Sequence, residues 1–270
     1  MAEIKKKNIV VCADDFGMNT AVNDGILHLA QLGRLNATSC LVEGPAFSAG
    51  VAALRDSSLQ IGLHLNFTEA MGRPGLYMPV GRLILQTWAR RLDMSHIAAQ
   101  VARQLDLFED GVGRPPDFID GHQHVHQFPQ IRTALLDEIG RRYAGRRLWL
   151  RNTCHGDLNG LPAALRFKAY TIEALGARHF VQRARRGGWR LNRGFLGVYD
   201  FKGGQQAYAS LLPRWLEHAR DGDAIMCHPA AVAVENDGLG PQRAAEFRVL
   251  GGSAMQGWLE RFGLELRPSA

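Results

Sequence analysis

The sequence lacks several features that would place it in a specialised class of protein. No apolar stretch approaches the roughly 20 residues that a membrane-spanning helix requires, and the apolar run from Ile9 to Ala13 is too short for the core of a signal peptide. No CxxC pair occurs either, and each cysteine lies beside or within an apolar run, where a reduced cysteine packs as a small hydrophobic residue. We therefore expect a cytoplasmic protein whose cysteines have no chemical role.

Regularly placed aromatic residues are missing from the basic parts of the chain. The formal net charge is +6, and the excess arginines gather in two stretches, residues 141–151 and 183–193. Because proteins that bind single-stranded nucleic acids combine positive charge with stacking aromatic side chains, we expect no nucleic-acid partner. The stretches are interpreted as solvated surface, with a site for an anionic substrate or a peripheral contact with a membrane as the alternatives.

What the sequence does contain is typical of a globular α/β protein. Apolar residues make up 46% and charged residues 21% of the chain. Short apolar, β-branched runs alternate with longer segments of helical period, as in repeated βα units around a parallel sheet. We predict one (β/α) barrel domain over residues 1–270, with about seven parallel strands. The predicted strands are 8–13, 37–42, 60–66, 117–119, 147–151, a weaker one near 195–201, and 223–227.

Helices are predicted between these strands, and one long loop differs from them in its composition. In the first helix, Val22, Ile26, Leu29 and Ala30 recur at the spacing of a core-facing side. The loop 70–81 is rich in glycine and proline and is long enough to overhang a site. The predicted helices are 20–32, 46–54, 95–108, 130–143, 162–175, 206–219 and one around 242–262.

Polar side chains follow the apolar strands at the points where the strands end. In a barrel of parallel strands all these ends lie on one face, so residues far apart in the sequence converge there. Five strand ends carry groups of this kind, and they include Asp14-Asp15, His64, the run from Asp120 to His126, Arg151-Asn152 and His228. This convergence predicts a site at that face.

The histidine-rich run is the most informative of these groups. Taken singly, an aspartate pair suits a turn or a helix cap, and His64 suits a hydrogen-bonded core position. Three histidines at alternate positions, His122, His124 and His126, are costly to bury and indicate a metal or proton-transfer role.

Metal-assisted hydrolysis is the chemistry that these residue types suit. One carboxylate and two neutral imidazoles form a three-ligand set that leaves a position open for water, which favours Zn²⁺ and tolerates other divalent ions. A magnesium site would more naturally consist of oxygen ligands. A second carboxylate can take a proton from the water, and a histidine can protonate the leaving group. Asp14 and His228 are available for these roles.

Four motifs resemble those of the YdjC-like carbohydrate deacetylases, a family that includes chitooligosaccharide and hopanoid-biosynthesis deacetylases. They cover nearly the whole chain, together with Arg243-x-x-Glu246 in the last predicted helix, and are ADDFGMN, IGLHLNFTE, PDFIDGHQHVHQFPQI and CHPA. The resemblance implies a distorted (β/α) barrel related to the polysaccharide deacetylases. It also implies removal of an acetyl group from an N-acetylated sugar.

Residue roles follow from the resemblance by position. It implies that Asp15, His64 and His122 are the metal ligands, that Asp14 is the general base and that His228 is the general acid. Ordinary polysaccharide deacetylases take both histidines from one short helical motif, whereas here they follow two different strands, so the mechanism of the wider superfamily transfers less directly than the ligand set.

The remaining polar groups at this face have alternative interpretations. If the strand continues through the histidine run, all three histidines point to one side, and His124 and His126 would support the site or contact the substrate. If the backbone bends after His122, His124 could replace it as a ligand. Asp120 belongs to the same supporting group, and Arg151 either keeps Asp14 ionised, contacts the substrate or is a surface residue.

The sequence therefore predicts a metal-dependent hydrolase that removes the acetyl group from an N-acetylated amino sugar. The alternatives are a metal-dependent phosphoesterase whose arginines bind phosphate and a non-catalytic sugar-binding protein. A chitooligosaccharide would require exposed aromatic residues, for which Tyr77, Trp88 and Trp189 are candidates. A lipid-linked sugar would require an apolar approach flanked by positive charge, for which residues 76–92 and the arginines are candidates. The choice of metal and the oligomeric state stay open.

Overall fold

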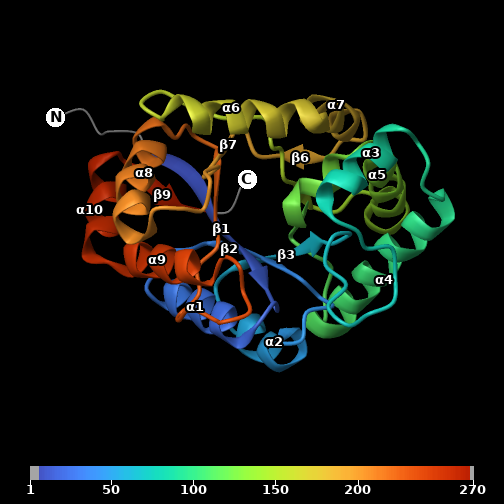
Figure 1. Ribbon diagram of the computed structural model, residues 1–270, viewed down its shortest axis with the longest axis horizontal. Helices are drawn as coiled ribbons and strands as arrows, with labels where there is room; N and C mark the ends of the chain where they lie inside the picture. The colour runs from blue at the N-terminus through green and yellow to red at the C-terminus, as the bar shows by residue number, and fades with distance from the viewer. Residues whose placement is uncertain (1–5, 268–270) are drawn as a thin grey trace.

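The protein is built around a curled sheet of parallel strands that is ringed by helices (Figure 1). The computed structural model describes residues 6–267. Its strand order is β6-β5-β4-β3-β2-β1-β8-β7, and β9 pairs separately with β1. The strands are β1 (Lys7–Phe16), β2 (Ala37–Cys40), β3 (Gln60–Leu65), β4 (Phe118–Gly121), β5 (Trp149–Leu150), β6 (Arg190–Leu191), β7 (Phe195–Leu196), β8 (Ala224–Cys227) and β9 (Leu264–Leu266).

The predicted distorted (β/α) barrel is confirmed, in the form of a half-barrel. All eight pairings between strands are parallel, and none joins β6 to β7 within residues 6–267, so the curl stays open there. The prediction missed β6 and β9. Strands of two and three residues are too short to show a period of their own.

Helices cover the outer face of the sheet. They are α1 (Thr20–Gln31), α2 (Phe47–Arg55), α3 (Val80–Trp88), α4 (Met94–Val112), α5 (Pro129–Tyr143), α6 (Ala163–Ile172), α7 (Arg178–Arg186), α8 (Gly204–His218), α9 (Gly240–Gly251) and α10 (Ser253–Arg261). The sequence did not predict α3 and α7, and the single helix expected around 242–262 is two helices that meet at Gly252. Extended φ and ψ angles at Gly252 separate them. Among residues 6–267, no helix is both long enough and apolar enough to cross a membrane.

The side chains of each strand alternate between the helices and the interior of the curl. In β1, Ile9, Val11 and Ala13 belong to the core that packs against the helices, whereas Val10 and Cys12 join an inner cluster. In this cluster the rings of Phe118 and Trp149 stack with centroids 4.4 Å apart. Apolar residues thus fill the interior near the start of the strands and leave the later positions to polar side chains.

Helix α1 is capped by a residue other than the two aspartates at the end of β1. The side chain of Asn19 caps the helix by accepting a hydrogen bond from the backbone N–H of Val22 at 2.9 Å. The predicted face of α1 is buried, with Val22, Ile26 and Leu29 fully inside the core. Because Asn19 is the cap, neither Asp14 nor Asp15 is needed for this task.

The packing of the inner cluster can be tested at one glycine of β3. A Cβ atom on Gly62 would lie 2.5 Å from the ring of Phe118, which is held by its stack on Trp149. We expect Gly62→Ala to lower the free energy of unfolding by about 1–3 kcal/mol, because overpacking forces buried side chains out of place. Gly140→Ala is the control, since its Cβ would meet nothing within 4 Å in helix α5, and it should stabilise the protein by about 0.5–1 kcal/mol. Urea denaturation measures both, and an unchanged midpoint for Gly62→Ala would contradict the packing described.

Candidate metal centre

Two consecutive aspartates at the end of β1 face the same pocket. Regular alternation would send Asp14 and Asp15 to opposite sides of the sheet. However, Asp15 has a φ of 74°, and the pairing of β1 with β2 shifts register between Ala13 and Phe16. This bulge turns both carboxylates into one cavity. A non-glycine residue in this conformation costs about 1–3 kcal/mol, so the surrounding contacts must hold it there.

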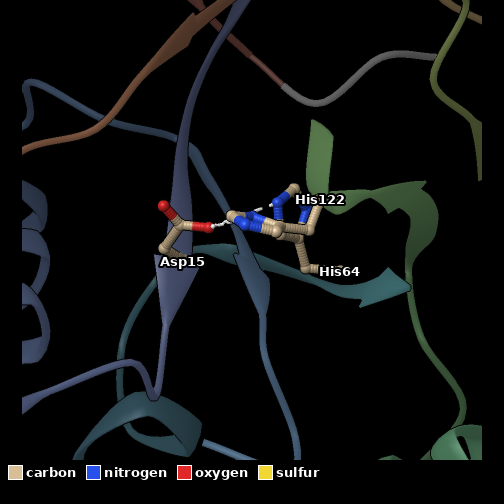
Figure 2. Close-up of side chains that lie close together, drawn as sticks. All are labelled: Asp15, His64 and His122. Carbon is tan, nitrogen blue, oxygen red and sulfur yellow. Dashed lines mark hydrogen bonds and ion pairs between the residues drawn. The ribbon is translucent and has the colours of Figure 1, made fainter. Parts of the chain in front are cut away.

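Asp15, His64 and His122 converge from three strand ends (Figure 2). The Oδ1 atom of Asp15 lies 3.3 Å from Nε2 of His64 and 3.0 Å from Nδ1 of His122. Their ligand atoms all lie within 4.8 Å of one another. Asp15 and His64 are buried, and the His122 side chain is 12% exposed. The residues that the resemblance assigned to the metal therefore lie together.

The donor atoms fit a divalent metal ion. Ligands about 2.0–2.1 Å from a tetrahedral zinc ion lie about 3.3 Å from one another, close to the separations at Asp15. His64 also has the partner that a metal-binding histidine usually has, because its Nδ1 lies 2.6 Å from Oδ1 of Asp120. A proton on Nδ1 that is donated to Asp120 would leave the Nε2 lone pair directed at Asp15 and the metal position.

Electrostatics also favour a cation at this place. Burial alone would lower the pKa of His64, but the carboxylates of Asp120 and Asp14 raise it to about 10. Burial alone would raise the pKa of Asp15, yet Arg243 and His122 hold it well below its usual value. Asp15 is thus ionised, and the surrounding carboxylates stabilise positive charge at His64.

A second group of metal-ligand types, Cys12, Asp14 and Asp120, already surrounds a cation of the protein itself. The two terminal nitrogens of Arg151 bind both oxygens of Asp14 at 2.6 Å, and Nη2 also lies 2.6 Å from Oδ2 of Asp120. Arg151 is 1% exposed, so its interpretation as a surface residue is wrong. Burial raises the pKa of Cys12 well above its usual value and keeps it a thiol. This group is therefore an ion-pair network.

The histidine run does not continue as a strand. Residues His122–Gln127 form a short 3-10 turn in which Gln123 and His124 have φ values of 51° and 61°. Of the two alternatives, the one in which a continuous strand places all three histidines on one side is therefore wrong. The backbone bends after His122, as the alternative supposed, but it is still His122 that lies beside Asp15.

The other two histidines of this turn have different surroundings. His124 lines the cavity, and its Nδ1 has no hydrogen-bond partner within residues 6–267. His126 is fully buried away from the cavity, with Nε2 3.0 Å from the carbonyl oxygen of Arg151 and its ring edge-on to Phe180. Burial lowers the pKa of His126 to about 4. His126 thus supports the backbone of Arg151 and has no direct access to a substrate.

Asp14 and His228 lie beside the three metal-ligand candidates. Burial would raise the pKa of Asp14, but Arg151 holds it well below its usual value, so Asp14 is ionised. Nε2 of His228 lies 3.9 Å from Oδ2 of Asp14. Burial lowers the pKa of His228 to about 4 against the opposing effect of Asp15 and Asp14. The imidazole is therefore neutral at pH 7.

The cavity above these groups has a volume of about 420 Å³ and largely apolar walls. Lys168 also lines it, donates to the carbonyl oxygen of Tyr199 at 2.6 Å and was not predicted, because one lysine in an amphipathic helix carries no signal in the sequence. None of the predicted aromatics, Tyr77, Trp88 and Trp189, lines the cavity. Its apolar walls consist of Val80, Ile84, Phe128, Ile172, Leu175, Val198, Phe201, Met226 and Leu239.

Solved structures similar to this one show the same fold. A protein of Enterococcus faecalis, named as a candidate cellobiose-phosphate cleavage protein, superposes with a TM-score of 0.71 at 21% identity, with 97% of each chain covered. A peptidoglycan N-acetylglucosamine deacetylase superposes with a TM-score of 0.52 at 12% identity, over 99% of this chain and 89% of that one. The half-barrel fold is thus shared with a peptidoglycan deacetylase.

Comparison of sequences identifies the family in addition to the fold. The mouse protein named carbohydrate deacetylase is 30% identical over 292 aligned positions, which cover 96% of this chain and 92% of the mouse protein. The family described as YdjC-like protein matches residues 8–261. The match includes every strand end that contributes to the candidate metal centre. The chain therefore belongs to the YdjC-like protein family, whose members include carbohydrate deacetylases.

Proposed function

We propose that this protein is a metal-dependent carbohydrate deacetylase that hydrolyses the acetamide group of an N-acetylated amino sugar. The observation that carries the proposal is the set Asp15, His64 and His122 at the base of a cavity, with Asp14 and His228 beside it. The name and coverage of the mouse relative support this reaction class. Acetate and a free amino sugar would be the products.

One divalent metal ion would be held by Asp15, His64 and His122. Zinc suits one carboxylate and two imidazoles best, and magnesium or another divalent ion is the alternative that metal analysis would distinguish. When bound, the ion would polarise the acetamide carbonyl group and make water a stronger nucleophile at neutral pH. Asp120 would keep the ring of His64 in the required orientation.

Asp14 and His228 would move the proton between water and the leaving amine. Arg151 occupies both oxygens of Asp14, but each carboxylate oxygen has two lone pairs and can still accept. Nε2 of the neutral His228 lies 3.9 Å from Oδ2 of Asp14, so it would receive the proton through one intervening water molecule. It would then deliver the proton to the nitrogen as the C–N bond breaks. His228 would thus act as the general acid only after it has gained this proton.

The cavity walls favour one substrate type over another. The apolar lining is mostly aliphatic, with Phe128 and Phe201 as its two aromatic members, and it includes none of the predicted stacking residues. It is therefore poorly suited to stacking a long chitooligosaccharide. It suits an N-acetylated sugar joined to an apolar group, with His124 and Lys168 available to bind hydroxyl groups.

The phosphoesterase alternative loses its main support in this structure. The arginines at the site, Arg151 and Arg243, are buried and paired with Asp14 and Asp15. The arginine-rich stretches do not line the cavity. No arginine of the described chain is therefore presented to a phosphate group there.

Removal of a proposed ligand tests the metal. We expect Asp15→Asn to weaken zinc binding by more than about 100-fold, because changes even in groups that only support a ligand cost 10–100-fold. Zinc content after dialysis, measured by plasma mass spectrometry, reports the loss. Asp24→Asn on the exposed side of α1 is the matched control. Equal zinc in all three proteins would remove Asp15 from the ligand set.

Replacement of His228 tests the proton transfer. We expect His228→Gln to lower kcat by about 10²–10⁴ with its zinc content unchanged, because general acid catalysis contributes about this factor. Acetate release is measured with N-acetylglucosamine mono- and oligosaccharides and with one lipid-linked N-acetylglucosamine. His96→Gln, at an exposed position of α4, is the control. If the zinc-loaded wild-type protein releases acetate from none of them, the deacetylase proposal is wrong for this substrate class.

A further inference from the structure

Helix α9 carries two charged side chains that are buried beside the metal centre. Arg243 is 2% exposed and Glu246 is fully buried. They are three residues apart and therefore lie on the same side of the helix. Burial of charged groups is costly unless they are paired, so their partners indicate what these two residues do.

Arg243 holds the oxygen of Asp15 that faces away from the histidines. Its Nη2 donates to Oδ2 of Asp15 at 2.7 Å, and its Nε lies 2.8 Å from Oδ2 of Asp237. Asp237 thereby fixes the guanidinium from the other side. With Oδ2 held in this way, only Oδ1 of Asp15 is directed at His64 and His122.

Glu246 holds the segment that carries His228. One carboxylate oxygen accepts the backbone N–H of His228 at 2.6 Å, and the other accepts the hydroxyl of Tyr199. The backbone carbonyl of Arg243 also accepts the N–H of Ala230 at 3.2 Å. Helix α9 therefore forms hydrogen bonds with the backbone on both sides of Pro229, and the imidazole of His228 remains free to face Asp14.

We propose that α9 is the positioning element of the site, in which Arg243 sets the affinity for the metal and Glu246 places His228 for proton transfer. The inference rests on the proposed metal-dependent function. Arg243 keeps Asp15 a ligand through one oxygen and prevents the carboxylate from rotating. Glu246 acts on a different group, so the two residues affect different steps.

Separate measurements distinguish the two roles. The dissociation constant for zinc alone is determined by competition with a chromogenic chelator, and kcat and KM are determined at saturating zinc. Arg243→Gln should weaken zinc binding by about 10–100-fold, the range for groups that orient a ligand. Glu246→Gln should leave zinc affinity and KM within about twofold and lower kcat by at least about tenfold, since misplaced proton-transfer groups forfeit part of their 10²–10⁴-fold effect. Arg248, which is exposed on the same helix, provides the control. Arg248→Gln should change neither the zinc affinity nor kcat.

Folding of the variants is checked by urea denaturation. If Arg243→Gln does not fold, Arg243→Lys serves in its place, because lysine keeps the charge but cannot reach Asp15 and Asp237 together. A folded arginine variant with wild-type zinc affinity would overturn the inference, as would equal changes in zinc affinity for the Arg243 and Glu246 variants. Failure of the wild-type protein to bind zinc would instead overturn the proposed function itself.

Discussion

The site depends on the pairing of buried charges inside the curl of strands. Asp14, Asp15 and Asp120 are all buried, and ionised carboxylates in such a place require cations. Arg151 bridges Asp14 and Asp120, and Arg243 holds Asp15. These two arginines satisfy the oxygens that face away from the metal position and leave one oxygen of Asp15 for it. The arrangement of charges thus decides where the proposed metal ion would bind.

Local backbone distortions allow the side chains to reach this arrangement. The positive φ of Asp15 brings two neighbouring aspartates to one side of the sheet, and those of Gln123 and His124 separate the directions of three histidines. Conformations of this kind persist only where the surrounding structure holds them, and they occur often at functional sites. Here the ion pair of Asp15 with Arg243 and the contact of His126 with the Arg151 backbone supply that restraint.

The charge network lies between two apolar regions of the interior. Apolar residues such as Phe118 and Trp149 fill the interior near the start of the strands and exclude water from beneath the charge network. Above it, the cavity has largely apolar walls with a few polar groups, among them His124 and Lys168. Low polarity on both sides strengthens the interactions between the charges. It would also favour a substrate that brings apolar surface with its sugar.

The sequence by itself determined most of the strands and helices in their order, but not β6, β9, α3 and α7. It also determined the set of strand ends that carry polar groups, because apolar periodicity is local and parallel strands all end at one face. Through the family resemblance it also identified Asp15, His64 and His122 as candidate metal ligands. Only the tertiary structure decided that Arg151 is buried, that His126 faces away from the cavity and that α9 contacts the site. These properties depend on backbone angles and on contacts between residues as far apart as 15 and 243, and no local pattern encodes such contacts.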